Sequence, residues 1–437
     1  MSDISGVHPY YEPGSDMTSK AYISWIDNTD NPGEGFDFRY REEGESEFED
    51  VEIFDEDDVP PVDFYRYTVV LDNLDSKTVY EAEIEDSQGN IQDIKFETLP
   101  RRLWKSEIRF CVISDTHLDD NVISEEAMDD IAEHDPEVFL VCGDLVDRAD
   151  QYNYPEESKA NSWLDWWRDY YTRVLPEDNF LIPFIMVNGN HDADVEWSLS
   201  GQDRDIIYDE EEVDEDNGYL KHFAVGLREE PPQGLNYADF KAGNSVQFTS
   251  IDTFTRTADN IAEWMEENDI IDRDRVVTSI PLSHQPVLAG AERRDADDEM
   301  QMFIREEWGW RLDVDSVVVK FNGHIHIEKI TKHWKVVEEE PDSGDYTDIG
   351  NGRYIKENPE QNGVIEFGSG YRSGRDLIDE WWLKSNTDDH SVAFKGWVDE
   401  NEVEVEVVRY GASNSTFTFD THNFVKNYNT NMFAGGV

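Results

Sequence analysis

Between residues 21 and 99, apolar and polar positions alternate in short runs that clusters of Asn, Asp, Gly and Pro separate. The runs are AYISWI, FDFRY, FYRYTVVL, TVYEAEI and IQDIKFETL. A period of two predicts half-buried β-strands, and the close spacing without a helical period predicts a small β-sandwich. We therefore expect an irregular leader over residues 1–20 and an all-β domain over residues 21–102.

After residue 105, apolar runs of strand length alternate with amphipathic stretches. The predicted strands are 108–114, 138–143, 180–188, 246–252, 276–280 and 317–321. Stretches such as NVISEEAMDDIAEHD and ANSWLDWWRDYYTRVL repeat apolar residues at spacings of three and four, as helices do. This alternation is typical of an α/β domain, which we expect over residues 103–437.

The second half of the chain also carries two acidic insertions with Gly and Pro, residues 193–240 and 338–361, which have no clear period. Near the C-terminus, NEVEVEVVRYG alternates cleanly and predicts an edge or outer strand. We expect residues 331–437 to supply further strands to the second domain.

Acidic residues dominate the charge, with 100 Asp and Glu against 37 Lys and Arg and a formal net charge of -63. Such a surface repels nucleic acid and anionic membranes, because both are bound through Lys and Arg. The 13 Trp, 19 Tyr and 22 Phe favour a folded chain over an acidic disordered one. We interpret the chain as a halophilic protein, because a Debye length of about 3 Å or less makes dense surface acid tolerable.

The first residues, MSDISGVHPY, lack a basic stretch followed by an apolar run, and no window approaches 18 uninterrupted apolar residues. We expect a soluble, cytoplasmic protein that does not bind membranes. Cys111 and Cys142 each end an apolar run, so we expect small buried side chains and no disulfide framework.

Residues of metal-ligand type follow five of the predicted strands, at the C-terminal ends where open α/β sheets place their sites. A pair of divalent ions needs oxygen and imidazole ligands and one carboxylate that can bridge them. Each motif alone is more typical of a turn, and only the ordered set indicates a metal centre. The seven candidate ligands are Asp115, His117, Asp144, Asn190, His284, His324 and His326.

In order, D-x-H, G-D-x-x-D, G-N-H-D, a His before Pro and G-H-x-H resemble the calcineurin-like metallophosphoesterases over about residues 106–330. The resemblance implies an α/β (α+β) metallophosphoesterase fold, a four-layer α/β/β/α sandwich. It also implies two divalent ions, for which we favour Mn(II), with Fe, Zn or a mixed pair as alternatives. One ion would take Asp115, His117, Asp144 and His326, and the other Asp144, Asn190, His284 and His324, with Asp144 as the bridge.

The resemblance also implies a mechanism, in which a hydroxide that bridges the two metals attacks the phosphorus. His191 would protonate the leaving group as a general acid, with Asp147 orienting it as in the similar Ser/Thr protein phosphatases. Arg148 would clamp the phosphate through bidentate donors. The alternative for Asp147 and Arg148 is a surface ion pair.

The segment VVLDNLDSKTVYEAEIEDSQGNIQDIKFETLP resembles the end of a fibronectin III-like domain. Purple acid phosphatases also carry such a domain ahead of the catalytic one, and GLNYADFKAGNSVQFTSIDT is similar to a strand pair of theirs. This chain keeps His117, however, and has Asp147 where those enzymes carry an iron-binding tyrosine. We therefore do not expect a purple Fe(III) centre.

The leading hypothesis is a metal-dependent hydrolase of phosphomonoesters or phosphodiesters, acting on a small molecule or another phosphoester. The first alternative is a recombination-repair type nuclease, which the lack of a basic patch disfavours. The second is a catalytically silent binding or scaffold protein, whose known members typically lose ligands that are all present here. Substrate identity and oligomeric state stay open at this stage.

Overall fold

The structure is a computed structural model, and the account below covers the parts of the chain that it describes. These are residues 4–10, 16–27, 35–59, 64–103, 106–117, 125–145, 166–175, 179–187, 189, 237–242, 246–251, 278–288, 290, 317–349, 352–358, 363–369, 376–387, 392–409 and 413–420.

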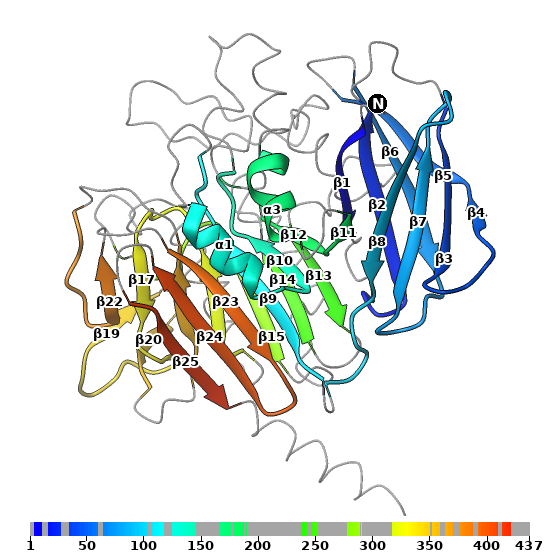
Figure 1. Cartoon of the computed structure of the whole chain (residues 1–437). Coiled ribbons are helices and arrows are strands. Elements are labelled where there is room, and N and C mark those ends of the chain that lie inside the picture. The colour runs from blue at the N-terminus through cyan, green and yellow to red at the C-terminus, as the bar shows by residue number, and fades with distance from the viewer. Residues whose placement is uncertain are drawn as a thin grey trace, which may run out of the picture.

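The N-terminal region is a β-sandwich (Figure 1, blue), as the alternating runs predicted. One sheet has the order β1 (Ile4–Tyr10), β2 (Lys20–Asp27), β6 (Phe64–Asp72), β5 (Ile53–Val59). The other has the order β11 (Phe180–Leu181), β8 (Ile91–Glu97), β7 (Val79–Glu85), β3 (Asp37–Glu42), β4 (Glu49–Val51). Between them Trp25 stacks on Phe38 and Tyr67 in one buried cluster. The likeness to a fibronectin III domain stays a prediction.

Two features of this sandwich differ from the expected boundaries. The predicted leader contains β1, which pairs antiparallel with β2 through a register shift between Ser5 and His8. Because of this irregularity and of Pro9, residues 4–10 show no regular alternation of apolar and polar positions, so the strand could not be recognised from the sequence. The predicted strand 180–188 is two strands, because Pro183 has no N–H to give to a ladder. Its first part, β11, joins the N-terminal sheet through β8, so the sandwich and the second region share a sheet.

The second region is built on two stacked sheets. The first has the order β12 (Phe184–Met186), β10 (Val138–Val141), β9 (Ile108–Ile113), β23 (Val392–Val398), β24 (Glu402–Arg409), β25 (Ser415–Asp420). The second has the order β13 (Tyr237–Ala242), β14 (Val246–Ile251), β15 (Thr278–Ser283), β16 (Val319–Asn322), β21 (Ile365–Gly368), β17 (Glu328–Thr331), β22 (Leu383–Thr387). Their facing side chains form one buried cluster, in which Phe110 meets Phe248 and Phe321 edge-on.

A helical layer covers the other face of the first sheet. It consists of α1 (Glu125–Glu133), the π-helix η1 (Trp167–Tyr171) and the short α3 (Thr172–Val174). Ala127, Met128 and Ile131 of α1 pack on that sheet in a second buried cluster. The described residues thus form three layers. The resemblance implied a fourth layer, which stays a prediction. The stretch ADNIAEWMEEND (258–269), whose apolar residues also recur at three and four, lies outside the described residues.

Two further expectations need correction. The strand β24 is not at the edge, because β25 pairs with its outer side. Its alternation instead reflects a sheet with one face buried and one face in water. The expected insertion 338–361 contains β19 (Tyr346–Asp348) and β20 (Tyr354–Glu357), which form a small sheet with β18 (Trp334–Val337). Strands this short carry too few residues for a period to be visible.

Other expectations are confirmed. Cys111 and Cys142 are buried and free, as predicted. The strand pair that the similarity implied is present as β13 and β14, which pair antiparallel.

Among the described residues, no helix is both long and apolar enough to cross a membrane.

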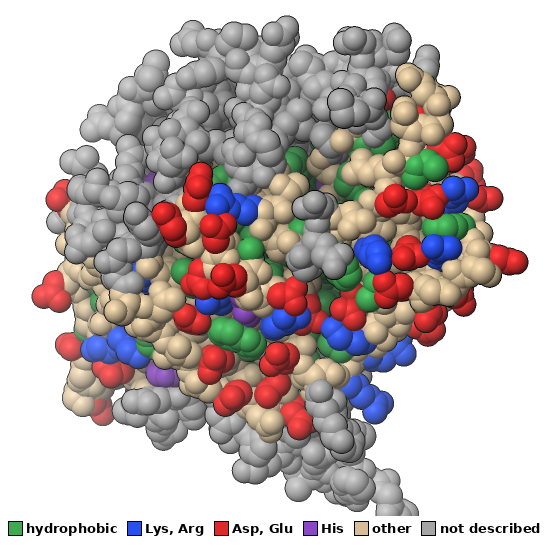
Figure 2. All heavy atoms as spheres, viewed as in Figure 1, with side chains coloured by type: hydrophobic (Ala, Val, Ile, Leu, Met, Phe, Trp, Pro, Cys, Tyr) green, Lys and Arg blue, Asp and Glu red, His purple; other side chains and the backbone are tan. Residues whose placement is uncertain are grey.

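On the face that Figure 2 shows, Asp and Glu side chains are spread over the described surface, with Lys and Arg side chains set among them. Several basic groups are paired across strands, such as Arg39 with Glu83 and Arg41 with Glu81. The excess acid repels itself, and salt screens that repulsion. We predict that the unfolding temperature rises by at least about 5 °C between 0.1 M and 2 M KCl, measured by calorimetry. An unchanged melting curve would refute the halophilic interpretation.

Candidate metal centre

The candidate ligands sit on turns that follow strand ends. Asp115 and His117 follow β9, Asp144 follows β10, and His324 and His326 follow β16. All five have a positive φ, between 35° and 68°, and they make up five of the eight such non-glycine residues described. Left-handed backbone costs about 1 kcal/mol or more per residue and gathers where function requires it. The concentration of this unfavourable backbone conformation at the candidate ligands indicates that these turns serve to place the ligand side chains.

Hydrogen bonds tie the first two ligand turns together. The amide of Asp115 donates to the carbonyl of Gly143 at 2.9 Å, and that of His117 to the carbonyl of Asp144 at 3.3 Å. The Thr116 hydroxyl donates to the carbonyl of Leu145 at 2.8 Å. These bonds continue the parallel β9–β10 pairing beyond the sheet and fix the spacing of the two carboxylates.

The third turn is held by Asp115 itself, whose two carboxylate oxygens accept from the amide of His324 at 2.9 and 3.0 Å. This approach requires Gly323, because a Cβ there would lie 2.6 Å from Asp115 Oδ2 and would overlap Ser114 Oγ. Gly189 is constrained in the same way, since a Cβ would overlap the Asp144 side chain. Glycines thus allow three chain segments to converge on the two carboxylates.

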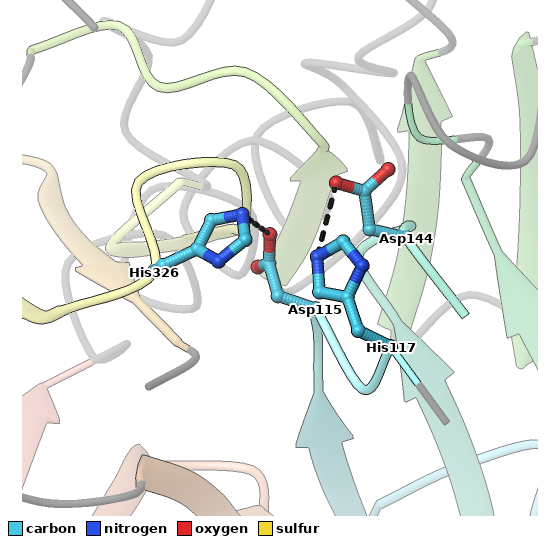
Figure 3. A group of neighbouring side chains, drawn as sticks. All are labelled: Asp115, His117, Asp144 and His326. Atoms are coloured by element: carbon cyan, nitrogen blue, oxygen red, sulfur yellow. Dashed lines mark ion pairs between the residues drawn. The ribbon is translucent and has the colours of Figure 1, made fainter. Parts of the chain in front are cut away.

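Four candidate ligands form one buried group. Asp115, His117, Asp144 and His326 each offer a ligand atom, and these atoms lie within 4.8 Å of one another (Figure 3). His326 Nε2 lies 3.3 Å from Asp115 Oδ1, and His117 Nε2 lies 3.6 Å from Asp144 Oδ2. The two imidazole rings stack at 4.8 Å. These are the four residues that the resemblance to the metallophosphoesterases implied for one ion.

Asp144 also lies close to two residues that the resemblance implied for a second ion, His284 and His324. His284 Nε2 is 3.2 Å from Asp144 Oδ2, and its ring meets that of His324 at 5.1 Å. His284 Nδ1 donates to the carbonyl of Cys142 at 2.5 Å. A histidine that ligates a metal commonly gives its other nitrogen to a carbonyl in this way, which sets its tautomer and orientation.

The electrostatics of the group favour a cation. Burial raises the pKa of Asp115 above its ordinary value, and the charge of Asp144 adds to that rise, while His284 and His117 oppose it. Burial tends to lower the pKa of His284, but Asp144 and Asp115 raise it to about 9. Two buried carboxylates repel each other, and a divalent ion between them would relieve that repulsion.

The donor set fits a metal. Carboxylate oxygens and imidazole nitrogens suit Mn, Fe and Zn, and four buried side chains that carry them converge here. The described residues therefore supply a candidate ligand group for one divalent ion.

Comparison with known proteins agrees with this geometry. Residues 108–328, slightly more than half of the chain, match the family model of the calcineurin-like phosphoesterases. The chain belongs to this family. No curated protein matches this phosphoesterase.

Among the solved structures that match the chain are two that align with most of its length. The first, a structure of PhoD, is 10% identical with a TM-score of 0.60 and covers 96% of this phosphoesterase and 90% of its own chain. It shares the fold over nearly the whole chain, N-terminal region included. The second, Vps29 from Chaetomium thermophilum, is 12% identical with a TM-score of 0.29 and covers 72% of this chain and 99% of its own.

Several site residues fall outside what the structure describes. Of the metal ligands this is Asn190, and of the proposed catalytic residues it is His191, Asp147 and Arg148. Sequence reasoning in turn missed Thr116, whose hydroxyl joins two ligand turns. Its place between Asp115 and His117 was the available signal, but a hydroxyl alone indicates no partner.

Proposed function

We propose that this phosphoesterase hydrolyses phosphomonoesters or phosphodiesters with two divalent ions, for which we favour Mn(II). The observation that carries the proposal is the buried group of two carboxylates and two imidazoles within 4.8 Å, with His284 on the far side of Asp144. Bound ions of this kind polarise a phosphoryl oxygen and make a water acidic enough to attack near neutral pH.

Asp144 is proposed as the carboxylate that both ions share. Its Oδ2 is 3.6 Å from His117 Nε2 and 3.2 Å from His284 Nε2, so one oxygen faces a histidine of each set. His324 and Asn190 would complete the second set. The described candidate ligands are all buried, so the packing around them limits the positions of their side chains.

His191 is proposed as the general acid, because it directly follows Asn190 and would share its turn. Asp147 would keep its ring oriented and protonated, and Arg148 would hold the phosphate. We predict that His191→Ala lowers kcat about 100-fold on alkyl phosphates, whose leaving groups need a proton, and far less on p-nitrophenyl phosphate. Equal losses on both substrates would contradict the acid role.

The described surface supports a small-molecule or other non-nucleic substrate over DNA or RNA. Its basic groups are scattered among carboxylates and form no stripe on the face shown in Figure 2. A nuclease would need cations along the path of the phosphate backbone. The same acidity supports our proposal of a high-salt cytoplasm as the site of action.

The test combines metal analysis with activity. Protein purified in molar KCl should hold about two equivalents of divalent metal after Mn(II) loading and desalting. It should then cleave p-nitrophenyl phosphate, bis-p-nitrophenyl phosphate or a cyclic nucleotide, and lose this activity on treatment with EDTA. Metal binding without hydrolysis of any ester, including single-stranded DNA, would favour the silent scaffold instead.

A further inference from the structure

Trp166 connects the metal-ligand turns to a part of the chain far from them in sequence. Its side chain is fully buried, and its Nε1 donates to Thr116 Oγ1 at 3.2 Å. The same hydroxyl donates its proton to the carbonyl of Leu145, in the turn that holds Asp144, and its oxygen accepts the hydrogen bond from the indole N–H. The Thr116 side chain therefore links the turn of Asp115 and His117 to the turn of Asp144, and Trp166 holds the Thr116 hydroxyl in place.

The next residue, Trp167, faces the N-terminal sandwich. Its ring stacks on His8 of β1 at 4.6 Å. A Cβ at Gly6 would lie 3.2 Å from Trp167 Nε1, so the backbone of β1 passes directly over the indole. The two consecutive tryptophans therefore contact the ligand turn and the sandwich, respectively.

The local backbone makes this division possible. Residues 167–171 form a π-helix, and the amide of Thr172 bonds to the carbonyl of Trp167, five residues back. Such wide turns are rare and occur frequently at functional sites. The helix is fixed from two sides, because the Tyr171 hydroxyl donates to the carbonyl of Ile182 at 2.6 Å and Arg173 pairs with Asp129 of α1 at 2.7 Å.

We infer that Trp166 is a positioning residue of the metal centre, and that β1 of the N-terminal sandwich keeps it in place through Trp167. The sandwich is then part of the assembly that shapes the metal site and not an independent appendage. The shared sheet formed by β8 and β11 agrees with this, since β11 leads through Ile182 into the strand β12 beside β10. The inference rests on the proposed function.

The first test uses Trp166→Phe, which keeps an aromatic ring but removes the N–H. Partners one shell removed from a metal typically change its affinity by about 10- to 100-fold. We expect the Mn(II) dissociation constant of the first site to rise by about tenfold or more, measured from the EPR signal of free Mn(II), with a matching fall in kcat/KM. Trp25→Phe is the control, because Trp25 is equally buried but lies in the core of the sandwich.

A second variant guards against a general loss of folding. Thr116→Val removes the hydroxyl and should weaken Mn(II) binding as Trp166→Phe does, and the double variant should be no weaker than the worse single one. Thr116→Ser keeps the hydroxyl and should restore binding. Fully additive effects would overturn the inference, since the two residues would then act separately.

The role of β1 is tested with two glycines of the sandwich that both have positive φ, Gly6 at 57° and Gly89 at 80°. Valine strains the backbone at either position, but only at Gly6 does it press on Trp167. Gly6→Val should weaken Mn(II) binding, and Gly89→Val should not. Equal effects, or unchanged binding in Gly6→Val and Trp166→Phe, would overturn the inference while the proposed function stands. If the wild-type protein binds no divalent ion, both fail.

Discussion

Asp144→Asn should lower kcat/KM by about 10⁴-fold, the largest loss expected from any single substitution in the chain. The change keeps the size of the side chain. Asparagine also tolerates the left-handed backbone of this position, where φ is 54°. It removes the negative charge that lies between His117 and His284. The measurement is kcat/KM with saturating Mn(II), together with metal content after desalting, which should fall from two equivalents to one or fewer.

The same substitution should not unfold the protein. Asp144 is fully buried, and its charge helps to raise the pKa of Asp115, so the two carboxylates repel each other. With EDTA present, Asp144→Asn relieves this repulsion but also removes the attraction that raises the pKa of His284, so the variant should keep a cooperative unfolding transition near the wild-type temperature. Asp135→Asn is the control, because Asp135 also has a positive φ of 54° but pairs with Arg109 at the surface. A loss of activity in both variants would mean that the backbone and not the metal ligand is responsible.

Glu366→Gln should destabilise the protein by about 3 to 5 kcal/mol, the largest stability effect we expect from a conservative change. Glu366 lies in β21 with no exposure, 2.7 Å from Lys320 Nζ and 2.8 Å from Lys329 Nζ. Its carboxylate also accepts from the amides of Val287 and Leu288, in the segment that follows His284. The neutral amide would leave the two buried ammonium groups without a counter-charge. Its NH₂ group would also face N–H groups that now donate to the carboxylate.

The pH dependence of stability identifies the charge as the cause. Burial alone would raise the pKa of Glu366, but Lys320 and Lys329 hold it at about 2. Because this pKa is depressed below the value of about 4.3 in the unfolded chain, the stabilisation is complete above pH 4.3. It is lost as the pH falls from there toward 2. Urea unfolding should show a difference between wild type and Glu366→Gln that is constant above about pH 5 and shrinks below pH 4.

Two comparisons make this result specific. Glu357→Gln is the matched control, since Glu357 pairs with Lys332 at 3.4 Å on the surface and should change stability by less than about 1 kcal/mol. Replacing both lysines by Met in the Glu366→Gln background should recover at least half of the loss, because the uncompensated charges are removed together. If Glu366→Gln behaves like Glu357→Gln, the buried cluster contributes nothing to stability.

Most of the candidate site could be predicted because its chemistry is local to each turn. Residues such as Asp115 and His117 stand two positions apart, directly after a run of apolar residues that reads as a strand. Parallel strands bring such turns to one edge, so the motifs at the strand ends were enough to predict a cluster of candidate ligands. The resemblance to the metallophosphoesterases then implied which four of them, Asp144 and His326 included, form one group. The strand periods of β7 and β8 were visible for a similar reason, since their side chains alternate between buried and more exposed positions.

The errors arose where contacts between distant residues decide the structure. The strand β1 is irregular and is a strand because β2 offers it a partner. The alternation of β24 is that of any strand with one buried face, so only the pairing with β25 shows that it is internal. The alternation of apolar and polar residues indicates which side chains are buried, but it does not indicate which strand pairs with which.

The sequence alone was enough to predict the residue types of the candidate ligands and their order along the chain, the acidic surface, and a β-region followed by an α/β region. Packing alone decided that Trp166 restrains Thr116, that β1 lies on Trp167, and that Glu366 sits between two lysines. The residues that meet are far apart in the sequence. Trp166 and Thr116 are separated by 50 positions, and Lys320 and Glu366 by 46. No local period encodes such a meeting, because its free energy comes from burying both groups in a core that exists only once the whole fold has formed.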